Sequence, residues 1–157
     1  MEIFTETIER ELPDLVRQGV RTRFVGRRDR APEALQQRMQ ALERETESNQ
    51  RLNLWIAFDY GGRAELADAA RRLIGSGIEA EEVDEDVLAV YLYAPDMPDP
   101  DLLIRTSGEL RISNFLLWQL AYSELVFVDT LWPDFGEDDL RGAVAEYAGR
   151  QRRFGGR

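Results

Sequence analysis

The sequence predicts an α/β fold in which a parallel β-sheet is flanked by helices. Segments with helical periodicity alternate along the chain with four short, strand-like apolar runs. One of these runs, residues 52–60 (LNLWIAFDY), is too apolar to alternate cleanly, which indicates a strand covered on both faces. With 157 residues, the chain is long enough for one domain with a substantial core. We therefore expect a single domain over residues 1–157.

The first part of the chain predicts a helix followed by a strand. A helical pattern starts at Met1 with no capping residue before it, Pro13 interrupts it and Gly19 can end it. Residues 20–26 (VRTRFVG) then alternate as a strand does. Because doubly wound domains usually open with a strand, we expect a further part of the domain to precede Met1.

The basic loop at residues 27–30 (RRDR) has two interpretations. Charged side chains at a turn are most simply explained as a solvated surface. Contact with a phosphate group is the alternative, because arginine binds phosphate well. The sequence favours the solvated turn.

The middle of the chain predicts a helix, a strand and a second helix. Pro32 occupies a first helical position. Apolar residues follow it at helical spacing: Leu35, Met39 and Leu42. After the strand at residues 52–60, Gly61 and Gly62 allow a close backbone approach before a helix that runs to Gly75.

The last part of the chain predicts a short helix over residues 83–93 and a stiff, extended approach over residues 94–101 (APDMPDPD). A short strand ending at Arg105, an apolar helix from Phe115 to Leu125 and a second strand follow. A final helix begins after Gly136 with an acidic first turn.

Composition limits the chemistry that the chain can perform. Its 30 acidic and 20 basic residues give a net charge of −10, which argues against nucleic acid as a partner. Cysteine and histidine are both absent, so disulfides, thiol chemistry and a histidine base are excluded. A metal would have to meet carboxylates, which suits magnesium. With no signal peptide or membrane-spanning apolar run in the sequence, we expect a cytoplasmic protein.

The candidate binding groups gather where the strand at residues 101–105 ends. Arg105 closes the strand, Thr106 to Gly108 turn the chain, and Arg111 and Ser113 come just before the predicted helix. Two guanidiniums, a hydroxyl and free helix N–H groups could converge on one phosphate or diphosphate. Pairing of the arginines with nearby carboxylates is the alternative, but exposed pairs contribute only ~0–1 kcal/mol, so we favour the anion site.

Four segments in order give the sequence a family resemblance. They are DYGGR (59–63), DLLIRTSGELRISNFLLWQLAYSEL (101–125), LWPDF (131–135) and RRFGG (152–156). Together they resemble the cis-prenyltransferases, the undecaprenyl diphosphate synthase family, over essentially the whole chain. The resemblance implies a prenyltransferase that condenses isopentenyl diphosphate onto an allylic diphosphate, with Mg²⁺ as cofactor, to make a polyprenyl diphosphate lipid carrier.

Two motifs of the family have no counterpart in this sequence. Family members carry an Asp-Gly-Asn-Gly-Arg-Trp motif with the catalytic aspartate, and a later Phe-Ser-x-Glu-Asn motif; neither occurs here. We therefore expect an N-terminally incomplete cis-prenyltransferase-like domain that contains no catalytic residue and is inactive alone.

The resemblance also assigns roles to individual residues. It implies that Arg105, Arg111 and Ser113 bind the diphosphate of isopentenyl diphosphate. It also implies that Arg152, Arg153 and Gly155 of the tail reach the diphosphate site of the partner in a dimer; a disordered basic tail is the alternative. It implies that Glu124 holds magnesium; a glutamate facing water at a helix end is the alternative. A homodimer packed through the apolar helix and peripheral contact with a membrane are further expectations of the resemblance.

Three hypotheses remain open for the function. The chain belongs to a truncated cis-prenyltransferase, or it is a non-catalytic partner subunit of a heteromeric one, or it is a diphosphate-binding protein without enzymatic activity. All three require an anion site around Arg105.

Overall fold

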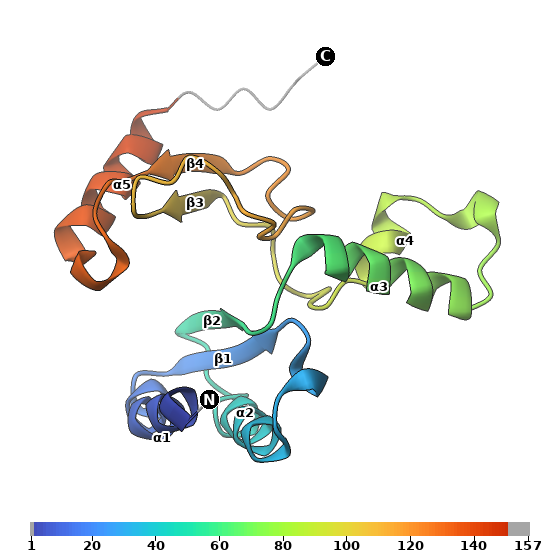
Figure 1. The fold of residues 1–157 in the computed structure, drawn as a ribbon, viewed down its shortest axis with the longest axis horizontal. Coiled ribbons are helices and arrows are strands. Elements are labelled where there is room, and N and C mark those ends of the chain that lie inside the picture. Colours follow the sequence, from blue (N-terminus) through green and yellow to red (C-terminus); the bar gives the residue numbers. More distant parts are fainter. Residues whose placement is uncertain (1, 151–157) are drawn as a thin grey trace. The chain divides into compact units, whose positions relative to one another are not determined.

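The computed structural model describes residues 2–150, and the chain divides into two compact units, Met1–Pro95 and Asp96–Arg157 (Figure 1). Each unit contains a two-stranded parallel sheet with helices beside it. The predicted α/β class with parallel strands flanked by helices is therefore confirmed. That residues 1–157 form a single domain stays a prediction.

The first unit is built on a β-α-β arrangement preceded by a helix. Strands β1 and β2 pair in parallel, with Val20 opposite Leu52 and Val25 opposite Ala57. Helices α1 and α2 contact each other and β1, and both lie on the same face of the sheet in Figure 1. The elements of this unit are α1 (Glu2–Arg17), β1 (Val20–Val25), α2 (Glu33–Glu45), β2 (Leu52–Ala57), α3 (Gly62–Gly75) and α4 (Glu85–Val90).

The core of this unit forms from the helical periodicity of α2. Side chains of Leu35, Met39 and Leu42 are buried and pack against Phe24 of β1, since residues four and seven positions apart share one helix face. The expectation that β2 is covered on both faces is wrong within this unit. Leu52 is 56% exposed, because the helices that contact the sheet lie on one face only.

The second unit pairs β3 with β4 in parallel, so that Leu102 lies opposite Glu124 and Arg105 opposite Phe127. Its elements are β3 (Leu102–Arg105), β4 (Glu124–Phe127) and α5 (Glu137–Gly149). Helix α5 contacts β4. The Asp139 carboxylate accepts a hydrogen bond from the Gly136 N–H (2.9 Å) at the start of α5, which satisfies a donor that the helix leaves free.

The helix predicted from Phe115 to Leu125 is not formed. Ser113, Asn114 and Leu116 have positive φ angles of 48°, 65° and 44°, and a left-handed residue breaks the right-handed hydrogen-bond ladder. Leu120 N–H makes one helix-type bond to the Leu116 carbonyl (2.9 Å) within a series of turns. The apolar side chains that are buried, Leu116 and Leu120, project from these turns and not from a helix.

Burial is uneven along this segment. Leu116 and Leu120 are buried, whereas Tyr122 is 82% exposed and Phe115 is exposed as well. The segment is therefore not buried on all sides within this chain, and a dimer contact there stays a prediction. Across the described residues, the structure contains no helix that combines the length and the apolar character needed to cross a membrane.

Candidate functional site

Arg105 is the last residue of β3 and lies where the sequence places a cation, at the carboxyl end of a parallel strand. Its backbone carbonyl accepts a hydrogen bond from Val128 N–H (2.8 Å), which holds the end of β3 against the chain leaving β4. The side chain is half-buried, and within residues 2–150 it makes no hydrogen bond or ion pair. A partly desolvated guanidinium with no carboxylate partner is well suited to bind an external anion.

The loop after Arg105 is attached to the loop after β4 by two backbone hydrogen bonds. Ser107 N–H donates to the Thr130 carbonyl (2.9 Å) and Gly108 N–H donates to the Val128 carbonyl (3.0 Å). Both donors have positive φ angles, 69° for Ser107 and 65° for Gly108. The path of the chain beyond Arg105 is therefore determined by contacts with the end of the second strand.

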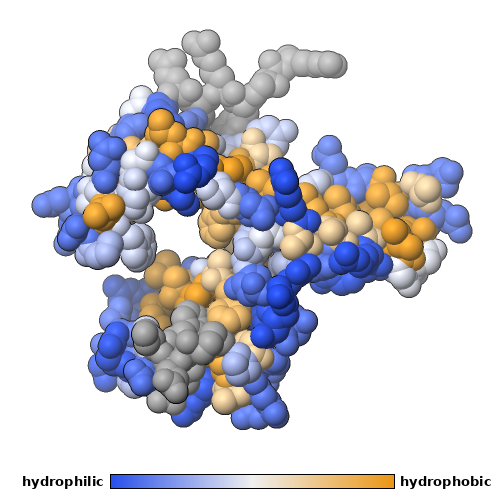
Figure 2. Space-filling model, in the orientation of Figure 1, coloured by the Kyte–Doolittle hydropathy of each residue, from blue (hydrophilic) through white to orange (hydrophobic). Residues whose placement is uncertain are grey.

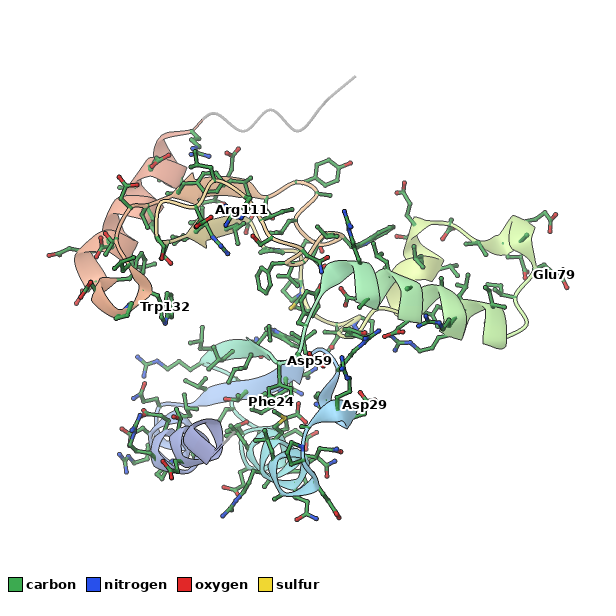
Figure 3. All side chains as sticks on the ribbon, viewed as in Figure 1. Phe24, Asp29, Asp59, Glu79, Arg111 and Trp132 are labelled. Atoms are coloured by element: carbon green, nitrogen blue, oxygen red, sulfur yellow. The ribbon has the colours of Figure 1, made fainter. Side chains whose placement is uncertain are left out.

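Arg111 lies farther along this loop and is labelled in Figure 3. Its side chain is exposed and forms an ion pair with Glu109. The Glu109 Oε2 atom is buried and accepts no hydrogen bond from the described residues, so the pair is close but not aligned as a hydrogen bond. Pairing with a nearby carboxylate, the alternative that the sequence left open, is therefore what the structure shows for Arg111. Glu109 occupies the guanidinium that an anion would need.

Ser113 is exposed, with a φ angle of 48°, and the residues directly after it form turns, not a helix. The expectation that free helix N–H groups complete the anion site is therefore wrong. Arg105, Arg111 and Ser113 share β3 and its outgoing loop, but no hydrogen bond or ion pair in the described part of the chain joins them. Their joint binding of one diphosphate stays a prediction.

Glu124, the predicted magnesium ligand, is the first residue of β4 and does not lie in a helix. Its Oε2 atom accepts a hydrogen bond from Arg150 Nη1 (2.7 Å). The described residues contain no group of three or more acidic side chains that could hold a metal ion. The residues around Glu124 therefore do not fit a magnesium site by themselves, because a guanidinium occupies the carboxylate.

Arg150 joins the end of α5 to β4. Besides Glu124, it donates to the Leu125 carbonyl (3.0 Å) and pairs with Glu146. Hydrogen bonds to Glu124 and then to Glu146 raise the pKa of the Arg150 guanidinium. The four-residue spacing could have predicted the pair with Glu146. No local pattern predicts the bond to Glu124. The tail residues assigned to diphosphate binding, Arg152, Arg153 and Gly155, lie outside the described residues.

Replacing Arg150 with alanine is expected to destabilise the second unit, because the Glu124 and Glu146 carboxylates and the Leu125 carbonyl lose their shared donor. The urea midpoint of this unit, followed by tryptophan fluorescence, should fall. The matched control is Arg141→Ala, which removes an exposed pair with Glu137 on the same helix and should leave the midpoint unchanged. Equal midpoints for Arg150→Ala and the control would contradict an anchoring role.

Comparison with known proteins identifies the family. The Prenyltransf family model, which describes undecaprenyl diphosphate synthases, matches residues 1–155. This chain belongs to the undecaprenyl diphosphate synthase family. The family resemblance of the four sequence segments is thereby confirmed.

Relatives within the undecaprenyl diphosphate synthase family match almost the whole chain. The isoprenyl transferase of Fusobacterium nucleatum is 49% identical over 156 residues, which are 99% of this chain and 66% of that protein. The (2E,6E)-farnesyl-diphosphate-specific ditrans,polycis-undecaprenyl-diphosphate synthase of Xanthomonas axonopodis pv. citri is also 49% identical, over 99% of this chain and 62% of its own length. The chain thus spans less than two thirds of the length of these two relatives.

The fold matches a solved member of the wider group. Lavandulyl diphosphate synthase from Lavandula x intermedia, solved in complex with dimethylallyl diphosphate, superposes with a TM-score of 0.94 at 35% identity. The match covers 99% of this chain and 70% of that one.

Proposed function

We propose that this chain supplies the isopentenyl-diphosphate-binding part of a cis-prenyl synthase, which condenses isopentenyl diphosphate onto an allylic diphosphate to form a polyprenyl diphosphate. The observation that carries the proposal is Arg105, a half-buried cation at the end of β3 that has no partner within residues 2–150. Membership of the undecaprenyl diphosphate synthase family supports the substrate class.

The proposed roles are binding and orientation. Arg105 binds the diphosphate, because a guanidinium can present two parallel N–H donors to phosphate oxygens. Arg111 joins only when the anion competes successfully with Glu109 for its guanidinium. Ser113 would then donate its hydroxyl. Positioning the diphosphate in this way places the isopentenyl double bond for attack on the allylic carbon.

The share of the reaction proposed for residues 1–157 is to bind and orient isopentenyl diphosphate, since the aspartate motif of the family does not occur among them. The proposal also includes Mg²⁺ as cofactor and a homodimer. The further carboxylates that a Mg²⁺ ion needs would come from the second copy or from a complete relative. A cytoplasmic location with the growing lipid at the membrane surface completes it.

Titration calorimetry with isopentenyl diphosphate tests the proposal. Arg105→Ala should weaken binding by about tenfold to a hundredfold, the value of one hydrogen-bonded charge. Arg141→Ala is the matched control, because it removes an exposed arginine of the same unit that is already paired with Glu137. Equal affinities of the wild type and Arg105→Ala would eliminate the proposed site.

A second measurement distinguishes two hypotheses: that the chain is part of a single-chain enzyme, or that it is a non-catalytic partner subunit. Mixing the chain with a full-length relative should increase product formation if the chain acts as a subunit. No association and no increase would favour the interpretation as part of a single-chain enzyme.

A further inference from the structure

The basic loop that follows β1 lines a pocket in the first unit. The pocket has a volume of about 590 Å³, and hydrophilic residues gather around the loop in Figure 2. It lies between this loop, α3 and the segment after α4. Its lining residues are Phe24, Gly26, Arg27, Arg28, Asp29, Arg30, Asp68, Arg72 and Tyr93. All of them belong to the first unit, whereas Arg105 belongs to the second.

One side of the pocket is held by a hydrogen-bonded network. Arg27 donates through Nε and Nη2 to the Asp68 carboxylate (3.1 and 3.0 Å), and its Nε lies 3.3 Å from the Tyr93 hydroxyl. Tyr93 in turn donates to Asp68. The hydrogen bond from Tyr93, followed by Arg27, lowers the pKa of the Asp68 carboxyl, so this carboxylate is ionised and fully occupied. The network holds the loop and α3 in one arrangement without disulfide or metal.

Arg72 of α3 contributes a guanidinium that this network leaves available. Its Nε donates to the Asp68 carbonyl (3.3 Å), and its Cζ lies 5.4 Å from the centre of the Tyr93 ring. These contacts orient the group. Within residues 2–150, its two Nη atoms form no ion pair with a carboxylate.

The other arginines of the pocket are held on its loop side. Arg28 Nη1 pairs with Glu43, and Arg30 Nη1 pairs with Asp59 at 3.0 Å. Figure 3 labels Asp29 in the turn after β1 and Asp59 just beyond β2. The Glu43 and Asp59 carboxylates each contact one end of a guanidinium, which has several donors.

The charges of the lining favour an anion. The lining holds four arginines and two aspartates. Arg28 and Arg30 pair with carboxylates outside the lining, so Arg72 is the lining guanidinium that has no carboxylate partner among the described residues. One of those aspartates, Asp68, is already neutralised by Arg27. A dianion with several acceptor oxygens would satisfy the donors that remain.

We propose that this pocket binds a phosphate-bearing anion, inorganic phosphate or diphosphate or the same group on a larger molecule, through Arg72, Arg30 and Arg28. Its lining residues all belong to the first unit, and the proposal does not depend on the proposed prenyl transfer. The proposal takes up the phosphate contact that the sequence leaves as the alternative for residues 27–30.

The test uses the full chain carrying Arg105→Ala, so that the site at β3 is removed, with titration of inorganic diphosphate, inorganic phosphate and sulfate. Diphosphate should still bind, more tightly than phosphate, and sulfate should bind most weakly. Adding Arg72→Ala should weaken diphosphate binding by about tenfold or more. Arg30→Ala is the second variant, because its side chain is 60% exposed and its loss should leave folding intact.

Arg17→Ala is the matched control, since Arg17 is an arginine of the same unit that is 72% exposed, pairs with Asp14 and does not line the pocket. It should retain the parental affinity. The proposal is overturned if the Arg105→Ala chain binds no diphosphate, or if Arg72→Ala and Arg17→Ala, each added to that chain, bind it equally. If Arg105→Ala binds isopentenyl diphosphate as tightly as the wild type, the proposed function fails and the pocket proposal still stands. The two experiments therefore test the two proposals separately.

Discussion

Glu65→Ala is expected to destabilise the first unit by about 2–4 kcal/mol. Glu65 lies in the first turn of α3 with none of its surface exposed. Its Oε1 atom accepts the Tyr93 N–H (3.0 Å) and its Oε2 atom accepts the Tyr60 hydroxyl. Alanine would leave both half-buried donors without this partner and a cavity beside them. The loop entering α3 and the chain after α4 would lose their common attachment.

The measurement is urea unfolding followed by the fluorescence of Trp55, which lies on β2, after Trp118 and Trp132 are replaced with phenylalanine. Glu65→Gln should cost less than alanine, because its amide oxygen can still accept one hydrogen bond. Glu81→Ala, an exposed acidic residue of the same unit, should change stability by less than about 0.5 kcal/mol. A Glu65→Ala variant as stable as the Glu81→Ala control would refute this role.

Gly26→Ala is expected to destabilise the same unit by about 3 kcal/mol or more. Gly26 follows β1 with a φ angle of 120°, a region that L side chains rarely adopt. A Cβ there would lie 2.1 Å from the Phe58 carbonyl oxygen, so the chain after β2 would have to move. The backbone hydrogen bond from Phe58 N–H to the Val25 carbonyl (2.8 Å) opposes that movement.

The control for this substitution is a glycine whose replacement by alanine should not lower the free energy of unfolding. Gly75→Ala, at the end of α3, meets no atom within 4 Å and should be neutral or stabilising by up to about 1 kcal/mol. The same Trp55 fluorescence assay compares the two. Similar stabilities for both glycine variants would show that the close approach at Gly26 is not maintained in solution.

Local patterns predicted most of the secondary structure correctly. The apolar spacing of Leu35, Met39 and Leu42 predicted α2 because one face of a helix repeats with that period. Arg105 was placed correctly at the end of a strand, since a short apolar run ending in a polar residue is a local feature. The parallel pairing of β1 with β2 agrees with the alternation of helices and strands, because α2 connects them. Strands β3 and β4 also pair in parallel, but no helix lies between them.

The apolar run after Ser113 shows where local patterns fail. Its composition suits a helix, but the structure satisfies the same side chains in turns, with Leu116 and Leu120 buried and three residues in left-handed conformations. Burial of an apolar residue depends on what it packs against, and the sequence pattern alone does not contain that information.

The sequence by itself determined the α/β class, the family and the segment that carries the candidate diphosphate site, because these follow from periodicity and from motifs within short stretches of chain. Only the tertiary structure decided which charges are occupied. Glu109 forms an ion pair with Arg111. Arg150 donates a hydrogen bond to Glu124, 26 residues earlier in the chain, and Arg27 donates one to Asp68, 41 residues later. Ion pairs between distant residues depend on how the elements pack, and that packing left Arg105 and Arg72 as the guanidiniums to test.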